Sequence, residues 1–375
     1  MKQEKILQLG FAAVLLALPV LSAVAGDLPD PLPDPDNQPA DMTKPVQVYI
    51  MMGQSNMLGF GTLAGTSEGT LEYAVKNKNQ YPYVIDDAGN WTQRADVRYA
   101  RVMSSGTGPM SVYNNQWLTT GCGNNSGKIG VELAIGNYLG YATDAPVLLV
   151  KSCIGNRALG WDLLPPGSPE YTYGEYTYPG YGDSPERWKT GTTPEPIGWY
   201  AGKQYDGDVR NAKTVLDNLG TYYPGATEYE VAGFFWWQGD RDRGMDGHAA
   251  YYEQNLAQLI EQLRIEFNAP DAKFVCATLG QTDEDTATGN EKLILDAQLA
   301  ISDPEQHPEF AGDVATVYSH PLSMGGASNS HYDGNAETYM NVGEAMGEAM
   351  VDLIPEPASL ALLGFGGLML LRRRK

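Results

Sequence analysis

Apolar residues between about position 46 and position 354 recur with two alternating periods. Short runs rich in β-branched and aromatic residues predict five buried strands, at 46–52, 146–152, 229–237, 273–279 and 314–318. Stretches in which apolar residues recur every three or four positions predict helices at 129–141, 206–219, 248–267, 291–301 and 335–353. Strands that alternate with helices of this length usually form a parallel sheet covered on both faces. The sequence therefore predicts an α/β fold of three layers with a central five-stranded parallel sheet.

Two long stretches interrupt this alternation. Residues 58–128 are polar and rich in Gly and Asn, and residues 165–205 contain seven prolines among many Tyr and Gly residues. Loops of this length inside a compact domain are usually functional or disordered. Tyr and Trp rings provide flat surfaces that suit stacking on sugar rings, although an insertion that packs only on itself fits the composition equally well.

The charge and the cysteines exclude several classes of partner. A formal net charge of −21 gives a surface that repels nucleic acid phosphates and anionic lipid headgroups, so neither is an expected partner. The three cysteines match no zinc motif, and the chain has only four histidines. We therefore expect no metal and no cofactor. The sequence leaves open whether two of the cysteines form a disulfide.

The first 45 residues are expected to lie outside the fold. Residues 1–25 have a basic start, an apolar stretch and Ala23-Val24-Ala25 as a small-residue cleavage site, which is the pattern of a secretory signal peptide. Residues 26–45 are rich in Pro and Asp with almost no large apolar side chain, so we expect a linker.

Residues 355–375 resemble the PEP-CTERM sorting signal of Gram-negative bacteria. Pro355-Glu356-Pro357 is followed by an apolar run at 358–371 and by a basic end at 372–375. The apolar run is shorter than the roughly 20 residues that a helix needs to cross a bilayer. The resemblance implies transient membrane retention, removal by an exosortase, and delivery to the cell surface, the outer membrane or the extracellular matrix.

Residues with catalytic chemistry follow four of the five predicted strands. Ser55 follows the first strand, Gly155 the second, Gln238 the third, and His331 comes in a Gly/Ser-rich loop after the fifth. In an open parallel sheet the active site lies at the carboxyl ends of the strands, so these residues can converge on one edge.

This set of residues suits acyl transfer to a serine. A serine hydroxyl needs a base to take its proton, histidine does this near neutral pH, and the resulting oxyanion needs preorganised donors. We therefore expect Ser55 to be the nucleophile and His331 the general base. We expect the oxyanion hole to consist of the backbone N–H groups of Ser55 and Gly155 and the side chain of Gln238.

Three blocks of sequence carry a family resemblance. The GQSNM block at 53–57, the WWQGD block at 236–240 and the HY block at 331–332 resemble the SGNH-type sialate O-acetylesterase and carbohydrate acetylesterase family. The resemblance implies a flavodoxin-like sheet within one esterase domain at 46–354, and no metal. It also implies a Ser-His pair that removes O-acetyl groups from mono-, oligo- or polysaccharides through an acetyl-enzyme. It does not identify the sugar.

Two positions depart from the family pattern. Ser328 stands where many members carry the Asp that orients the catalytic histidine, and Asp240 stands where Glu is commoner. Polar side chains that could orient His331 or contact the substrate are Gln54, Asn56, Arg157, Asp240 and Asp333. Three alternatives stay open: a non-catalytic carbohydrate-binding protein, an esterase for lipid or aryl esters, and His320 as the base.

Overall fold

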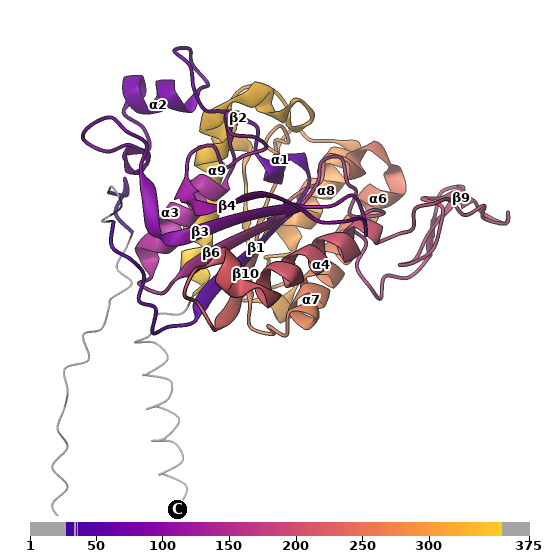
Figure 1. The fold of residues 1–375 in the computed structure, drawn as a ribbon. Helices are drawn as coiled ribbons and strands as arrows, with labels where there is room; N and C mark the ends of the chain where they lie inside the picture. The colour runs from indigo at the N-terminus through magenta and orange to yellow at the C-terminus, as the bar shows by residue number, and fades with distance from the viewer. Residues whose placement is uncertain (1–27, 34, 36, 355–375) are drawn as a thin grey trace, which may run out of the picture. The chain divides into compact units, whose positions relative to one another are not determined.

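Strand β1 (Val46–Gly53) lies in the middle of a seven-stranded sheet (Figure 1). The structure, a computed structural model, describes residues 28–354 except 34 and 36. The segments expected to be a signal peptide and a sorting signal therefore lie outside the described residues. Within the described residues, no helix has the length and hydrophobicity needed to span a membrane.

The sheet contains all five predicted strands and two more. Its order is β12-β11-β10-β1-β6-β3-β4. The predicted five occur in the order 2-1-3-4-5, which is the flavodoxin-like order. Neighbouring strands pair in parallel, except that β4 is antiparallel to β3. The remaining strands of the sheet are β3 (Gln93–Met103), β4 (Ser111–Thr119), β6 (Val147–Ser152), β10 (Tyr229–Trp237), β11 (Lys273–Ala277) and β12 (Val314–Val317).

The predicted count of five strands was wrong because β3 and β4 lie in the polar stretch 58–128. Strand β3 places charged side chains at buried positions and satisfies them with partners. Arg94 forms two hydrogen bonds with Asp96, and the Nε of Arg98 donates to the carbonyl of Tyr222 at 2.8 Å. Strand β4 is an edge strand, and most of its residues are exposed or only half-buried, so it lacks an apolar run.

Helices cover both faces of the sheet, so the predicted three layers are confirmed. Helices α3 and α9 pack on one face, and α4, α7 and α8 contribute to the core on the other. The predicted helix at 248–267 is divided at Tyr251 into two helices. The helices are α1 (Ser55–Leu58), α2 (Leu71–Lys78), α3 (Glu132–Ala142), α4 (Lys203–Asp217), α5 (Leu219–Tyr222), α6 (Asp246–Ala250), α7 (Tyr252–Glu266), α8 (Gly289–Ala300) and α9 (Ala336–Leu353).

Two small sheets lie outside the main one. Strands β2 (Gly61–Thr62) and β5 (Lys128–Ile129) pair with each other. The Pro- and Tyr-rich insertion forms a three-stranded sheet of β7 (Tyr171–Tyr173), β8 (Tyr176–Tyr178) and β9 (Trp188–Lys189), which projects from the body of the domain (Figure 1).

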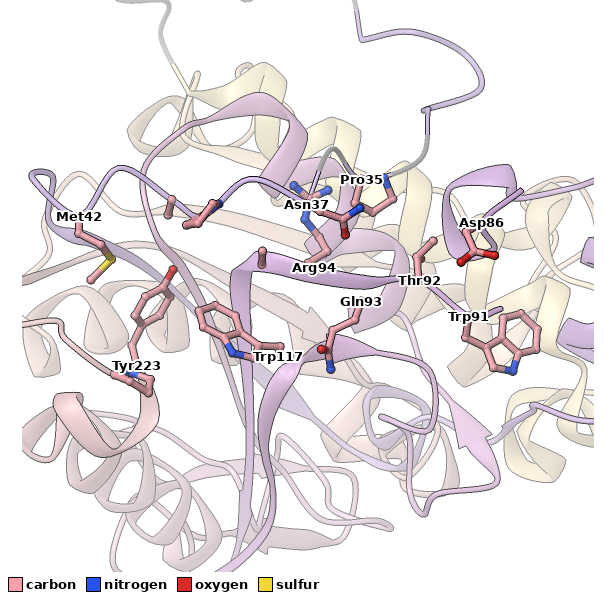
Figure 2. Close-up of a pocket in the computed structure, with 14 residues that line it drawn as sticks. Pro35, Asn37, Met42, Asp86, Trp91, Thr92, Gln93, Arg94, Trp117 and Tyr223 are labelled. Atoms are coloured by element: carbon pink, nitrogen blue, oxygen red, sulfur yellow. The ribbon is translucent and has the colours of Figure 1, made fainter. Parts of the chain in front are cut away.

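The described part of segment 26–45 lies against the domain. Leu32 is 2% exposed within the apolar core, and the backbone N–H of Asp41 donates to the carbonyl of Asp144 at 2.7 Å. Together with the amino end of β3, Trp117 of β4 and Tyr223, this segment lines a cavity of about 710 Å³ (Figure 2). That cavity lies at the opposite edge of the sheet from the residues that follow β1, β6 and β10.

A close approach of two backbones ends β1. Gly53 has φ +143°, and a Cβ at this position would lie 2.4 Å from the carbonyl oxygen of Trp237, its partner in β10. Only a glycine fits this position without displacing β10.

We predict that Gly53→Ala lowers the free energy of unfolding by about 2–4 kcal/mol, because the new methyl group clashes with backbone and the residue keeps a positive φ. Urea unfolding of the variant measures this change. Gly198→Ala is the matched control, because a Cβ there meets no atom within 4 Å. A Gly53→Ala variant as stable as Gly198→Ala would contradict the packing argument.

Candidate functional site

The segments that contain Ser55 and His331 contact each other. Ser55 begins α1 directly after β1, and His331 lies in the 3-10 segment η5 (Ser328–Gly334), which contacts α1. The Nδ2 of Asn56 lies 3.5 Å from the hydroxyl of Tyr332. The rings of Phe60 and His331 stack with centroids 4.0 Å apart and an interplanar angle of 8°. The predicted convergence of these two loops is therefore confirmed.

Gly155 lies against the serine. A Cβ at Gly155 would be 3.5 Å from the Cβ of Ser55, in ordinary van der Waals contact. Within the described part of the chain, the backbone N–H groups of Ser55 and Gly155 donate to no other group. Both are therefore available to an oxyanion beside the serine.

The backbone at His331 adopts a conformation that L-residues rarely take. His331, Tyr332 and Asp333 all have φ near +55°. Tyr332 is buried, stacks on Trp237 with centroids 5.7 Å apart, and accepts a hydrogen bond from the N–H of Gly280 at 3.2 Å. Backbone strain of this kind persists where packing imposes it and is common at functional sites.

Asp240 is the carboxylate whose charge acts on His331. Partial burial lowers the pKa of His331 below its usual 6.5, and the negative charge of Asp240 opposes that shift. The hydroxyl of Ser328 donates to Oδ1 of Asp240 at 2.8 Å, and Nε of Arg243 donates to the same oxygen at 2.8 Å. A neutral imidazole near pH 7 is the form that can accept a proton.

Gln238 does not have the free donor that we expected of it. Its side chain is fully buried, and its amide nitrogen lies within hydrogen-bonding distance of three acceptors, in Gln54, Arg157 and Asp242. Its amide oxygen accepts from the hydroxyl of Tyr252 at 2.8 Å. Two amide hydrogens shared by three acceptors leave none for an oxyanion, so this arrangement makes Gln238 a brace between loops.

Of the other residues expected at the site, Gln54 and Arg157 contact neighbouring loops, whereas Asp333 lies on the surface. Gln54 is 2% exposed, and its side-chain oxygen accepts from the N–H of Arg241 at 3.2 Å. The guanidinium of Arg157 lies 5.0 Å from the ring centre of Trp199. Asp333 is exposed and bonds to no described residue, so it does not orient His331 here.

His320 belongs to a different pair. Its Nδ1 lies 2.9 Å from the carbonyl oxygen of Gly280, and its Nε2 lies 3.3 Å from the carboxylate of Asp283. With both ring nitrogens engaged, His320 is a weaker candidate for the base than His331.

A buried ion pair near the site, Lys151 with Glu132, had been missed, and the buried Asp242 bonds to backbone of the loop after β6. Lys151 forms an ion pair with Glu132, both fully buried, and its Nζ lies 3.5 Å from the carbonyl oxygen of Leu58, the last residue of α1. Asp242 accepts from the N–H groups of Leu159 and Gly160 at 2.9 and 2.8 Å, and burial raises its pKa to about 6. Lys151 interrupts an otherwise apolar strand, which was the one signal in the sequence.

Among the described residues, no three His, Cys, Asp or Glu side chains are grouped so that they could hold a metal ion. Cys122, Cys153 and Cys276 are all buried free thiols, so the open question of a disulfide is answered by three unpaired cysteines.

Asp208, on α4, is buried beside Ser152, the last residue of the strand β6 that leads to Gly155. Its Oδ1 accepts from Gln204 at 3.0 Å and from Ser152 at 3.2 Å, and burial raises its pKa to about 8. Between the unfolded pKa near 3.8 and about 8, the folded protein holds a proton that the unfolded chain releases. The contribution of Asp208 to stability is therefore present at low pH and is lost as the pH rises through this window.

We expect the free energy of unfolding of the wild type to fall between pH 5 and pH 8, and Asp208 alone contributes a slope of up to about 1.4 kcal/mol per pH unit. We predict that Asp208→Asn removes this contribution, so that the free energy of unfolding falls less steeply over this range. Urea midpoints at both pH values measure it. Asp217→Asn, an exposed site on the same helix, should leave the wild-type slope intact. Equal slopes for wild type and Asp208→Asn would show that the carboxyl is already ionised at pH 5.

Residues 182–352 match the family model described as carbohydrate esterase, sialic acid-specific acetylesterase. The match begins inside the Tyr-rich insertion and contains Gln238, Asp240 and His331, whereas Ser55 and Gly155 precede it. On this match the chain is a carboxylic ester hydrolase, a carbohydrate O-acetylesterase. No curated protein matches the chain.

Three solved structures resemble the fold. A protein from Arabidopsis thaliana is 16% identical over 82% of this chain and 98% of its own, with a TM-score of 0.47. A carbohydrate acetylesterase from Xanthomonas citri is 16% identical over 80% of this chain and 54% of its own, with a TM-score of 0.46. NanS is 15% identical over 73% of this chain and 78% of its own, with a TM-score of 0.38. At these values the likeness concerns the fold alone.

Proposed function

We propose that this carbohydrate O-acetylesterase acts through Ser55 and His331 and an acetyl-enzyme intermediate. His331 takes the proton of the Ser55 hydroxyl as its oxygen attacks the acetyl carbonyl. The carbon–oxygen bond to the sugar then breaks, and the sugar oxygen receives that proton. Water, deprotonated by His331, releases acetate and restores the serine. The single observation that carries this proposal is the contact between α1, which begins with Ser55, and η5, which contains His331. His331 is partly buried there and stacks on Phe60.

Two backbone N–H groups form the proposed oxyanion hole. The N–H groups of Ser55 and Gly155 are unpaired within the described chain, and Gly155 lies against the Ser55 side chain. Gln238 keeps the Gly155 loop in place through its bond to the carbonyl of Arg157 at 2.8 Å. Preorganised donors of this type are worth about 3 kcal/mol each in the transition state.

Asp240 is the proposed orienting carboxylate of the histidine. Its charge favours the imidazolium that forms during attack, and Ser328 and Arg243 fix its position. The alternative of a non-catalytic carbohydrate-binding protein rested on two features, the Ser at position 328 and the Tyr-rich insertion. A carboxylate supplied from the β10 loop answers the first of these, and the insertion is equally compatible with an esterase, so we favour catalysis.

We predict that Ser55→Ala abolishes acetate release from acetylated sugars, by at least about 10⁴-fold, because no other nucleophile replaces the hydroxyl. Acetate is measured enzymatically for residues 26–354. Ser302→Ala, which removes a hydroxyl bonded only to a helix carbonyl, should retain full activity. A serine-directed fluorophosphonate should label wild type and not Ser55→Ala, and labelling of both would assign the nucleophile elsewhere.

We predict that Asp240→Asn lowers kcat/KM about ten- to hundredfold and lowers the apparent pKa of the ascending limb of the pH profile, because the imidazolium loses its counter-charge. Adding Ser328→Asp to that variant should restore much of the activity and raise the limb again. Asp333→Asn should change neither. Loss of activity in Asp333→Asn and not in Asp240→Asn would reverse the assignment of the carboxylate.

Export completes the proposal. The signal-peptide pattern at 1–25 and the sorting-signal pattern at 355–375 support secretion and cell-surface delivery with an exosortase as the processing partner. Mass spectrometry of the mature protein from a host that carries an exosortase would locate both cleavage sites. Intact termini in that host would contradict this part of the proposal.

A further inference from the structure

Four tyrosines form a row on one face of the small sheet in the insertion. Tyr171 pairs with Tyr178, and Tyr173 pairs with Tyr176, across the antiparallel strands β7 and β8. Paired residues, and residues two apart in a strand, point to the same face. We call these four residues the tyrosine row.

The inner half of the row is fixed to the domain. The ring of Tyr171 stacks on that of Tyr251 with centroids 3.7 Å apart, and its hydroxyl donates to the carbonyl of Gly247 at 3.0 Å. Tyr178 is 1% exposed, stacks on Tyr171 at 5.0 Å and meets the edge of His248. A side chain at Gly247 would enter the Tyr178 ring, since its Cβ would lie 2.2 Å away. The row is therefore anchored before any ligand binds.

The outer half of the row faces solvent. Tyr173 is 39% and Tyr176 is 38% exposed, and Arg187 lies 4.3 Å from the ring centre of Tyr176. Single exposed apolar residues need no explanation, but two exposed aromatic residues paired across the strands of an anchored sheet offer ring faces to a ligand.

The sheet that carries the row is tied to the catalytic edge. The guanidinium of Arg241 lies 3.3 Å from the carboxylate of Glu186, next to Arg187. The backbone N–H of the same Arg241 donates to Gln54, the residue before the nucleophile. The row thus starts at the catalytic edge of the main sheet, and its sheet extends outward from the domain (Figure 1).

We propose that the outer tyrosines, Tyr173 and Tyr176, bind the sugar rings of a neutral O-acetylated polysaccharide whose acetyl group enters the Ser55 site. The negative ring faces of tyrosine suit the C–H faces of pyranose rings, and anchoring avoids the entropy of ordering the surface. A net charge of −21 disfavours a polyanionic chain. This inference rests on the proposed esterase function and adds its substrate class.

The test compares a polymer with a small ester. For Tyr173→Ala/Tyr176→Ala, we expect the KM for chemically acetylated xylan to rise about tenfold or more, with kcat/KM for 4-nitrophenyl acetate unchanged. Tyr173→Phe/Tyr176→Phe should keep the wild-type KM because the rings remain. Tyr229→Ala removes a tyrosine that is 43% exposed at the amino end of β10, away from the site, and should also keep it.

The outcomes separate the two proposals. A wild type that hydrolyses neither substrate would contradict the esterase mechanism. If the double alanine variant hydrolyses 4-nitrophenyl acetate normally and its KM for the polymer is unchanged, only the proposed sugar binding by the outer tyrosines is contradicted. A wild type that prefers acetylated pectin to acetylated xylan would overturn the neutral ligand. Sedimentation velocity that shows a wild-type dimer and a monomeric double alanine variant would make the row a contact between copies of this chain.

Discussion

The parallel pairing of β1 with β10 on one side and β6 on the other is the constraint on which the site depends. Gly53 and Trp237 end their strands in register, so Gln54 and Gln238 leave the sheet at the same level and bond to each other. The backbones come so close there that only glycine fits at position 53. Because β6 runs in the same direction, Gly155 reaches the serine from the other side. The serine environment is thus a product of strand register rather than of any loop alone.

Buried charge beneath the strand ends fixes the loops that this register brings together. The Lys151–Glu132 pair lies under α1, and Asp242 holds two backbone N–H groups of the loop after Gly155. Buried ion pairs contribute little net stability compared with apolar packing, but removal of one partner is costly. These buried charges therefore hold backbone groups of the loops in place, because Lys151 lies near the carbonyl of Leu58 and Asp242 accepts from Leu159 and Gly160.

Much of this architecture followed from local pattern, and the remainder depended on contacts between distant residues. The five predicted strands and their flavodoxin-like order came from runs of apolar residues, which report burial directly. Strand β3 was not predicted because it contains buried arginines, whose partners a hydropathy pattern does not show. One such partner is the carbonyl of Tyr222, which accepts from Arg98. Likewise, a glutamine after a strand looks like an oxyanion donor until its buried partners are known. The three acceptors of the Gln238 amide nitrogen lie in the loops after β1, β6 and β10, so the residues next to Gln238 in the sequence do not reveal all of them.

The two departures from the family pattern are parts of one arrangement. Ser328 and Asp240 lie 88 positions apart in the chain, yet the serine hydroxyl donates to the aspartate. Ser328 and Arg243 both bond to Oδ1, and Oδ2 accepts from no group in the described chain, which leaves that oxygen for the imidazole or the substrate. A serine at 328 supplies a donor to this carboxylate where a second carboxylate would repel it. In the proposed mechanism, the charge that favours protonated His331 therefore comes from the β10 loop, so the histidine loop and the β10 loop must pack together for His331 to act as the base.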